Sequence, residues 1–148
     1  MGRIPSPACY VRQSKPGLRI RVTTRIFIAD DDIAIRRLLR RILEERSGWE
    51  VCGEAENGAD AVARVAELAP DVVILDLAMP QKNGIQAARE ISAVSPRLPM
   101  LLLTVQESSR ELAKEAEKAG FRAVLSKEKG TEVIEGIETL LKGDPEAA

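Results

Sequence analysis

Carboxylates, a hydroxyl and an ammonium group follow short apolar runs of the chain. The run Asp30-Asp31-Asp32 comes after the first of them, and Asp76, Thr104 and Lys127 stand at the ends of later ones. Carboxylates that share a cleft repel one another, and Lys127 can neutralise only one of their charges. A divalent metal would absorb the remaining charge. All-oxygen ligation with few protein ligands favours Mg²⁺.

A carboxylate beside such a metal can attack phosphorus. Asp76 is the predicted nucleophile, which would become an aspartyl phosphate. Lys127 would stabilise charge on the transferred group, and the hydroxyl of Thr104 would donate to a phosphoryl oxygen. Each residue alone has an ordinary explanation, since an aspartate after a strand usually caps a helix, as expected of Asp32. Only their combination indicates phosphoryl chemistry.

Five β-α repeats would position these groups. The runs IFIA, VVIL and MLLL are apolar throughout, as expected for strands that helices cover on both faces. The alternation predicts an α/β fold, a doubly wound parallel sheet with right-handed crossovers, whose carboxyl edge gathers functional groups. Strands are expected at residues 26–29, 50–54, 72–75, 100–103 and 123–125, and helices at 33–43, 59–68, 85–94, 109–119 and 131–141.

The composition excludes several kinds of catalysis. The 148 residues include no histidine, so the chain cannot build a Ser-His-Asp triad, a Cys-His pair or a His-ligated zinc site alone. The net charge is −1, but six bases and no acid fall within residues 1–25, so the rest of the chain is acidic. An acidic body disfavours direct binding of nucleic acid.

We expect three parts along the chain. Residues 1–24 are rich in proline and arginine, a composition that predicts a basic, flexible arm. This arm is either a leader without function or a tether for an acidic partner. The domain is expected at 25–142 and a short tail at 143–148. Cys9 and Cys52 show neither zinc nor disulfide spacing, and no apolar run approaches the roughly 18 residues that span a bilayer. These features predict a cytoplasmic protein without a membrane partner.

The chain from Arg25 to Leu141 resembles the receiver domains of bacterial two-component response regulators. Four motifs occur in the family's order and spacing: IFIADDD, VVILDLAMPQKNG, LLLT and AGFRAVLSKEKG. The resemblance implies a flavodoxin-like sheet of strand order 2-1-3-4-5 with five helices. By position, Asp76 would be the phosphoacceptor and a Mg²⁺ ligand, Asp31 a direct ligand, and Asp30 a ligand mostly through water. The backbone carbonyl of Ala78 would be a further ligand.

The resemblance also implies the partners and the switch. The donor would be a phosphohistidine on a sensor histidine kinase or a histidine phosphotransfer protein, which would supply the imidazole that this chain lacks. The receiver would catalyse only its own phosphorylation and dephosphorylation, with Thr104 and Lys127 contacting the phosphoryl group and biasing the switch. A homodimer could form on activation. The expected interaction surface has mixed charges at helical spacing: Glu111, Lys114, Glu115, Lys118 and Arg122.

Two positions depart from the family pattern. Val124 stands where receivers usually carry a Tyr or Phe whose inward turn reports phosphorylation, so the relay must be shortened or different. Glu128 follows Lys127 where many receivers have Pro. This resembles the branch whose receivers are fused to a helix-turn-helix output domain and regulate transcription.

Other functions fit the residues less well. A haloacid-dehalogenase-type phosphatase needs an Asp where Ala78 stands, and the Gly53–Gly58 spacing of a P-loop is followed by Ala59 instead of Lys-Ser/Thr. The alternative that stays open is a receiver-like interaction module that signals without phosphorylation. Val124 keeps this alternative open, whereas five intact site residues speak against it: Asp30, Asp31, Asp76, Thr104 and Lys127. Within the receiver hypothesis, Ala78 and Gln106 are expected to flank the path of the water that hydrolyses the aspartyl phosphate.

Overall fold

The computed structural model describes residues 23–105, 109–128 and 130–143 of the chain. Five strands and five helices alternate in this part of the protein. The strands are β1 (Thr24–Ala29), β2 (Trp49–Ala55), β3 (Val72–Asp76), β4 (Met100–Thr104) and β5 (Ala123–Ser126). The helices are α2 (Ile33–Glu44), α3 (Gly58–Leu68), α4 (Gly84–Val94), α5 (Arg110–Ala119) and α6 (Gly130–Gly143).

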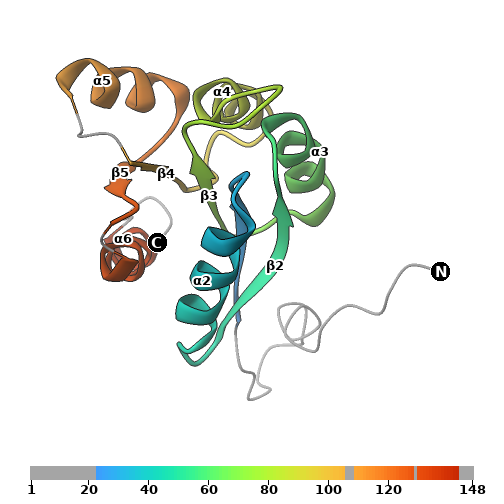
Figure 1. Ribbon diagram of the computed structural model, residues 1–148, viewed down its shortest axis with the longest axis vertical. Helices are drawn as coiled ribbons and strands as arrows, with labels where there is room; N and C mark the ends of the chain where they lie inside the picture. The colour runs from blue at the N-terminus through green and yellow to red at the C-terminus, as the bar shows by residue number, and fades with distance from the viewer. Residues whose placement is uncertain (1–22, 106–108, 129, 144–148) are drawn as a thin grey trace.

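The strands form one parallel sheet in the order β2-β1-β3-β4-β5. Helices α2 and α6 cover one face of this sheet, and α3, α4 and α5 cover the other (Figure 1). The predicted flavodoxin-like fold is therefore confirmed. Strand β1 begins two residues earlier than expected, because Thr24 and Arg25 pair with Trp49 and Glu50 at the start of β2.

Side chains that alternate along the central strands build a core on each face of the sheet. Phe27 of β1 and Val73 of β3 pack among α3, α4 and α5, whereas their neighbours Ile26 and Val72 pack against α2 and α6. All four are fully buried. Because both faces are covered, the strands are apolar at successive positions and not only at alternate ones.

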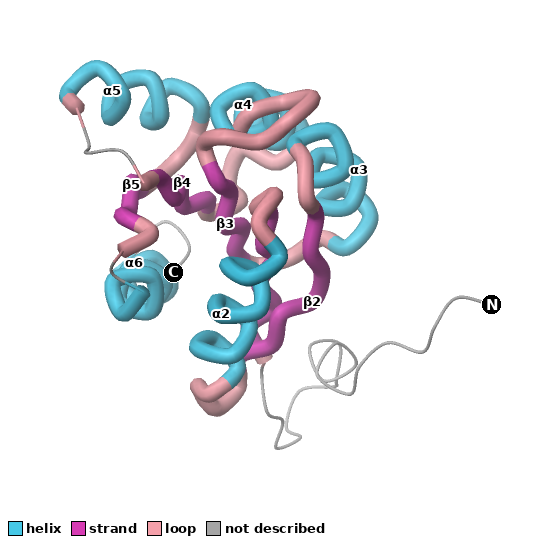
Figure 2. The backbone as a smooth tube through the Cα atoms, viewed as in Figure 1, coloured by secondary structure: helices cyan, strands magenta, loops and turns pink. Residues whose placement is uncertain are grey.

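The loops after β1 and β3, pink in Figure 2, leave the sheet at its carboxyl edge. Asp32 ends the first loop as the N-cap of α2, where its side chain accepts from the backbone N–H of Ala34 at 2.8 Å. This confirms the capping role predicted for Asp32. Gly84 begins α4 so close to β3 that a Cβ there would lie 2.4 Å from the carbonyl oxygen of Asp76. The second loop is therefore packed tightly against the strand that precedes it.

The helices are short, from 10 residues in α5 to 14 in α6. No helix in the described ranges has the length and apolar character needed to cross a membrane.

Candidate functional site

The predicted acidic cluster forms at the carboxyl edge of the sheet. Asp30 and Asp31 follow β1, and Asp76 ends β3, the strand that pairs with β1. One carboxylate oxygen from each of the three residues lies within 4.8 Å of the other two. Asp30 and Asp76 are buried, with 0% and 3% of their surface exposed, whereas Asp31 is exposed. The cluster therefore reaches solvent on the side of Asp31.

Lys127 supplies a cation to this cluster. Its Nζ atom lies 2.8 Å from Oδ2 of Asp30 and 3.0 Å from Oδ1 of Asp76. Its backbone N–H donates to the carbonyl of Thr104 at 3.0 Å, which ties the end of β5 to the end of β4. Burial alone would lower the pKa of Lys127, but its hydrogen bonds and charge interactions with Asp30 and Asp76 outweigh burial and raise it. Lys127 is therefore an ammonium at neutral pH.

The Asp76 carboxylate is held at an energetic disadvantage. Burial raises its pKa above the usual value, and the charge of Asp30 adds to this increase. Lys127 and a hydrogen bond from the backbone of Ala78 act in the opposite direction without cancelling it. A further cation beside Asp76 would relieve this repulsion.

The donor set fits a small, hard divalent cation. Three carboxylates face one ammonium, and their oxygens are close enough to share one ion. Such an arrangement, with few protein ligands and an open side, is typical of Mg²⁺ sites. The carbonyl of Ala78 stays a predicted ligand, although the backbone of this residue is already placed beside Asp76 by its hydrogen bond.

Thr104 ends β4 at the same edge of the sheet. It is 3% exposed, and the residue before it, Leu103, is the register partner of Asp76. Val124 of β5 is partly buried against the core beneath α5. It lines an open hollow of about 630 Å³, together with Phe121, Ala123 and residues of α5. Gln106, predicted to flank the path of water, lies outside the described residues.

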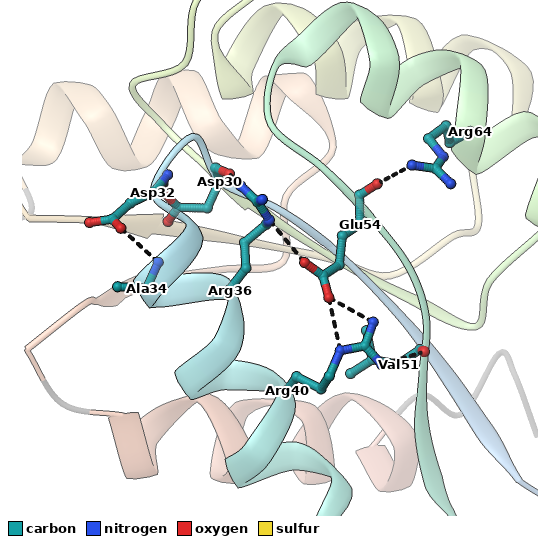
Figure 3. Close-up of polar contacts among 8 residues, drawn as sticks. All are labelled: Asp30, Asp32, Ala34, Arg36, Arg40, Val51, Glu54 and Arg64. Carbon is teal, nitrogen blue, oxygen red and sulfur yellow. Dashed lines mark hydrogen bonds and ion pairs between the residues drawn. The ribbon is translucent and has the colours of Figure 1, made fainter.

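The sequence analysis missed Arg36 and Glu54, which form a hydrogen-bonded pair beside the cluster. Arg36 of α2 turns inward and donates from Nη1 to the carbonyl of Asp30 at 2.6 Å. Its Nε atom donates to Glu54, at the end of β2, at 2.9 Å (Figure 3). The available signal was the pair Arg36 and Arg40, one helical turn apart, together with an acid near the end of the adjacent strand.

Comparison with known proteins identifies the family. The sheet order and the acidic cluster at its carboxyl edge define a flavodoxin-like domain of the signalling type. Residues 26–138 match the sequence model of the response regulator receiver domain, and the chain belongs to this family. The resemblance stated from the motifs is thus confirmed.

The chain is similar both to single-domain and to longer regulators. It is 34% identical over 119 residues to the chemotaxis protein CheY of Thermotoga maritima, covering 80% of this chain and 98% of that protein. It is 42% identical over 107 residues to the transcriptional regulatory protein PdtaR of Mycobacterium tuberculosis, covering 72% of this chain but only 50% of PdtaR. A LuxR-family two-component response regulator from an Aurantimonas species superposes with a TM-score of 0.77 at 33% identity, covering 82% of this chain and 86% of that one.

Family and site together define the kind of activity. The chain is a two-component receiver, as its motifs predicted. Its acidic cluster with Lys127 fits phosphorylation-dependent signalling.

Proposed function

We propose that Asp76 accepts a phosphoryl group, in a Mg²⁺-dependent reaction, from a phosphohistidine of a sensor histidine kinase or a histidine phosphotransfer protein in the cytoplasm. The observation that carries the proposal is the placement of the Lys127 ammonium, 2.8 Å from Asp30 and 3.0 Å from Asp76. A partly buried lysine that contacts two buried carboxylates is positioned to neutralise an anionic group that joins them.

The residues of this chain would divide the work as follows. An oxygen of Asp76 attacks phosphorus and forms a P–O bond, while the P–N bond of the donor breaks and its electron pair stays on the imidazole nitrogen, which then takes a proton. Lys127 keeps its contact with the acceptor and balances charge on the phosphoryl oxygens, and the hydroxyl of Thr104 donates to one of them. Bound Mg²⁺ would offset the negative charge of the cluster and of the phosphoryl group.

We propose that Asp31 binds the metal directly and that Asp30 binds it mostly through a water molecule. Asp76 and the carbonyl of Ala78 are the remaining proposed protein ligands. The exposure of Asp31 and the full burial of Asp30, whose carboxylate is already engaged by Lys127, support this division. Titration with MgCl₂ should shift the NMR signals of backbone amides at these positions in the wild type. The response should be strongly reduced in Asp31→Asn.

Phosphorylation is tested with a small donor. Acetyl phosphate and Mg²⁺ should add one phosphoryl group to the protein, observed by intact-mass spectrometry. The addition should disappear in Asp76→Asn and in excess EDTA. Asp32→Asn is the matched control, because Asp32 belongs to the same acidic run but caps α2, a role that asparagine also fulfils. If no donor modifies the wild type, the proposal is wrong and the alternative, a receiver-like module that signals without phosphorylation, takes its place.

The output is proposed to be a protein interaction surface on α5 and the segment that leads into β5. Its charged residues are all exposed: Glu111, Lys114, Glu115, Lys118 and Arg122. The hollow lined by Phe121 and Val124 adjoins them. Activation would expose this surface to a target protein or to a second copy of the chain. Sedimentation with and without beryllium fluoride tests the homodimer, and identical profiles would exclude it.

We further propose that the pathway in which this surface acts regulates transcription, a proposal supported by the similarity to PdtaR and to a LuxR-family regulator. The division predicted from the sequence stays a proposal, with a basic arm at 1–24, the receiver domain at 25–142 and a short tail at 143–148. At its edges, Thr24 belongs to β1 and Gly143 to α6. Deletion of the first 22 residues should leave phosphorylation of Asp76 unchanged if the arm is a leader or a tether.

A further inference from the structure

A network of charged side chains lies directly behind the acidic cluster. Arg36 of α2 donates from Nη1 to the carbonyl oxygen of Asp30 at 2.6 Å and from Nε to Oε1 of Glu54 at 2.9 Å. Arg40, one turn further along α2, contacts Oε2 of Glu54 at 2.6 Å (Figure 3). The guanidinium of Arg36 thus joins Glu54, near the end of β2, to the backbone of Asp30.

Glu54 fixes the orientation of that guanidinium. Burial alone would raise the pKa of Glu54, but hydrogen bonds and charges from Arg40 and Arg36 outweigh burial and lower it, so Glu54 is a carboxylate at neutral pH. The side chain of Arg36 is only 11% exposed. A buried, planar guanidinium with one edge on a carboxylate has little freedom, and its remaining N–H groups are directed at a defined point.

That point is the backbone of Asp30, which other hydrogen bonds also restrain. Its N–H donates to the carbonyl of Ala55 at 3.0 Å, and its Oδ1 accepts from the N–H of Asp32 at 2.9 Å. Arg36 adds a restraint on the carbonyl oxygen. This carbonyl belongs to the peptide unit that connects Asp30 to Asp31, so its orientation sets the direction in which Asp31 leaves the strand.

We propose that Arg36, held by Glu54, is a positioning residue for the metal site, and that it raises Mg²⁺ affinity by fixing the Asp30–Asp31 peptide unit. The inference rests on the proposed function, because it assumes that this cluster binds Mg²⁺. Residues that orient metal ligands without touching the metal typically change affinity by about 10- to 100-fold. We expect the Arg36→Met variant to lose about tenfold in Mg²⁺ affinity, at the lower end of that range.

A purely structural role for the network predicts a different pattern. Arg40 contacts Glu54, Glu44 and the carbonyl of Val51. The contacts with Glu54 and Val51 join α2 to β2, and none of the three reaches Asp30. If the network only secures α2 against β2, Arg40→Met should weaken Mg²⁺ binding as much as Arg36→Met. If Arg36 positions the ligands, Arg40→Met should lower the melting temperature while largely preserving affinity.

The test is an NMR titration of the full chain with MgCl₂, read from the backbone amides around the cluster. Three variants are compared with the wild type: Arg36→Met, Arg40→Met and Arg37→Met. Arg37 is exposed on the same helix, so its variant controls for the loss of one positive charge. The expected result is a roughly tenfold weaker Kd for Arg36→Met only, with the other two within about threefold of the wild type.

Two outcomes separate the inference from the function on which it rests. Equal affinities of Arg36→Met and the wild type, or equal losses in Arg36→Met and Arg40→Met, would overturn the inference and leave the proposed function standing. No Mg²⁺ response in the wild type would overturn both. If Arg36→Met does not fold in EDTA, Arg36→Lys takes its place: lysine keeps the charge but lacks the planar fork that holds Glu54 and the Asp30 carbonyl together, so it should also weaken binding.

Discussion

Lys127 should be essential for the stability of the metal-free protein, and Lys127→Met tests this directly. The ammonium is 13% exposed and contacts two carboxylates that are almost completely buried. Methionine preserves most of the apolar stem and removes only the charge and the donors. The variant therefore leaves Asp30 and Asp76 facing each other with no cation between them.

The distances set the size of the effect. At 2.8 and 3.0 Å, an effective dielectric constant of about 20 gives an attraction of roughly 6 kcal/mol for each pair. Desolvation of the three groups cancels much of that attraction. Removal of one partner from a buried ion pair typically costs about 3–5 kcal/mol, and this is the destabilisation that we expect. For a domain of this size it corresponds to a decrease of about 10–25 °C in Tm.

Thermal unfolding followed by circular dichroism measures the effect, first in EDTA and then in MgCl₂. Mg²⁺ should restore part of the lost stability, because the metal replaces the missing positive charge. Lys82→Met is the control. Lys82 pairs with Glu90 at 2.9 Å, and both side chains are more than a third exposed. Such exposed ion pairs contribute no more than about 1 kcal/mol to the free energy of unfolding. If Lys127→Met and Lys82→Met melt at the same temperature in EDTA, repulsion between Asp30 and Asp76 does not destabilise the metal-free protein, and the prediction is wrong.

Three further predictions address other parts of the site. Asp76→Asn should raise the Tm in metal-free buffer, because burial raises the pKa of Asp76 and the neutral amide avoids repulsion from Asp30; a lower Tm would contradict this reading. The folded state lowers the pKa of Glu54, so the ionised side chain stabilises the fold above its unfolded pKa, and this stabilisation is lost as the pH falls through the folded pKa. In urea unfolding between pH 7 and pH 3, the free energies of unfolding of the wild type and Glu54→Gln should therefore converge in acid. Gly84→Ala should destabilise the fold by about 1–3 kcal/mol and slow phosphorylation by acetyl phosphate, because the new Cβ would lie 2.4 Å from the carbonyl oxygen of Asp76. Gly136→Ala is the control: its Cβ would first meet a flexible side chain at 3.1 Å, so this variant should fold and react normally.

The sequence predicted the sheet and the cluster for a physical reason. Runs such as VVIL can be buried on both faces only in a covered parallel sheet, and the carboxyl ends of its strands meet at one edge. Asp30, Asp76 and Lys127 were therefore brought together by topology alone. The inward turn of Arg36 could not be predicted in this way, because it depends on where Glu54 lies in three dimensions. The earlier start of β1 has a similar origin, since its first pairs are formed with Trp49 and Glu50.

The placement of Lys127 also suggests how a signal leaves the site without an aromatic residue at position 124. Lys127 follows β5, a strand of only four residues in which each side chain is partly exposed. Its backbone N–H donates to the carbonyl of Thr104, and its ammonium forms an ion pair with Asp76, the proposed phosphoacceptor. A phosphoryl group on Asp76 would move negative charge outward from the buried carboxylate, and both the ammonium and the Thr104 hydroxyl would follow it. Since these two residues are joined by a backbone hydrogen bond, we expect the ends of β4 and β5 to move together. Val124 lies on β5 and lines the hollow beside α5. If the proposed phosphorylation displaces these strand ends, we expect the displacement to reach the proposed interaction surface through β5.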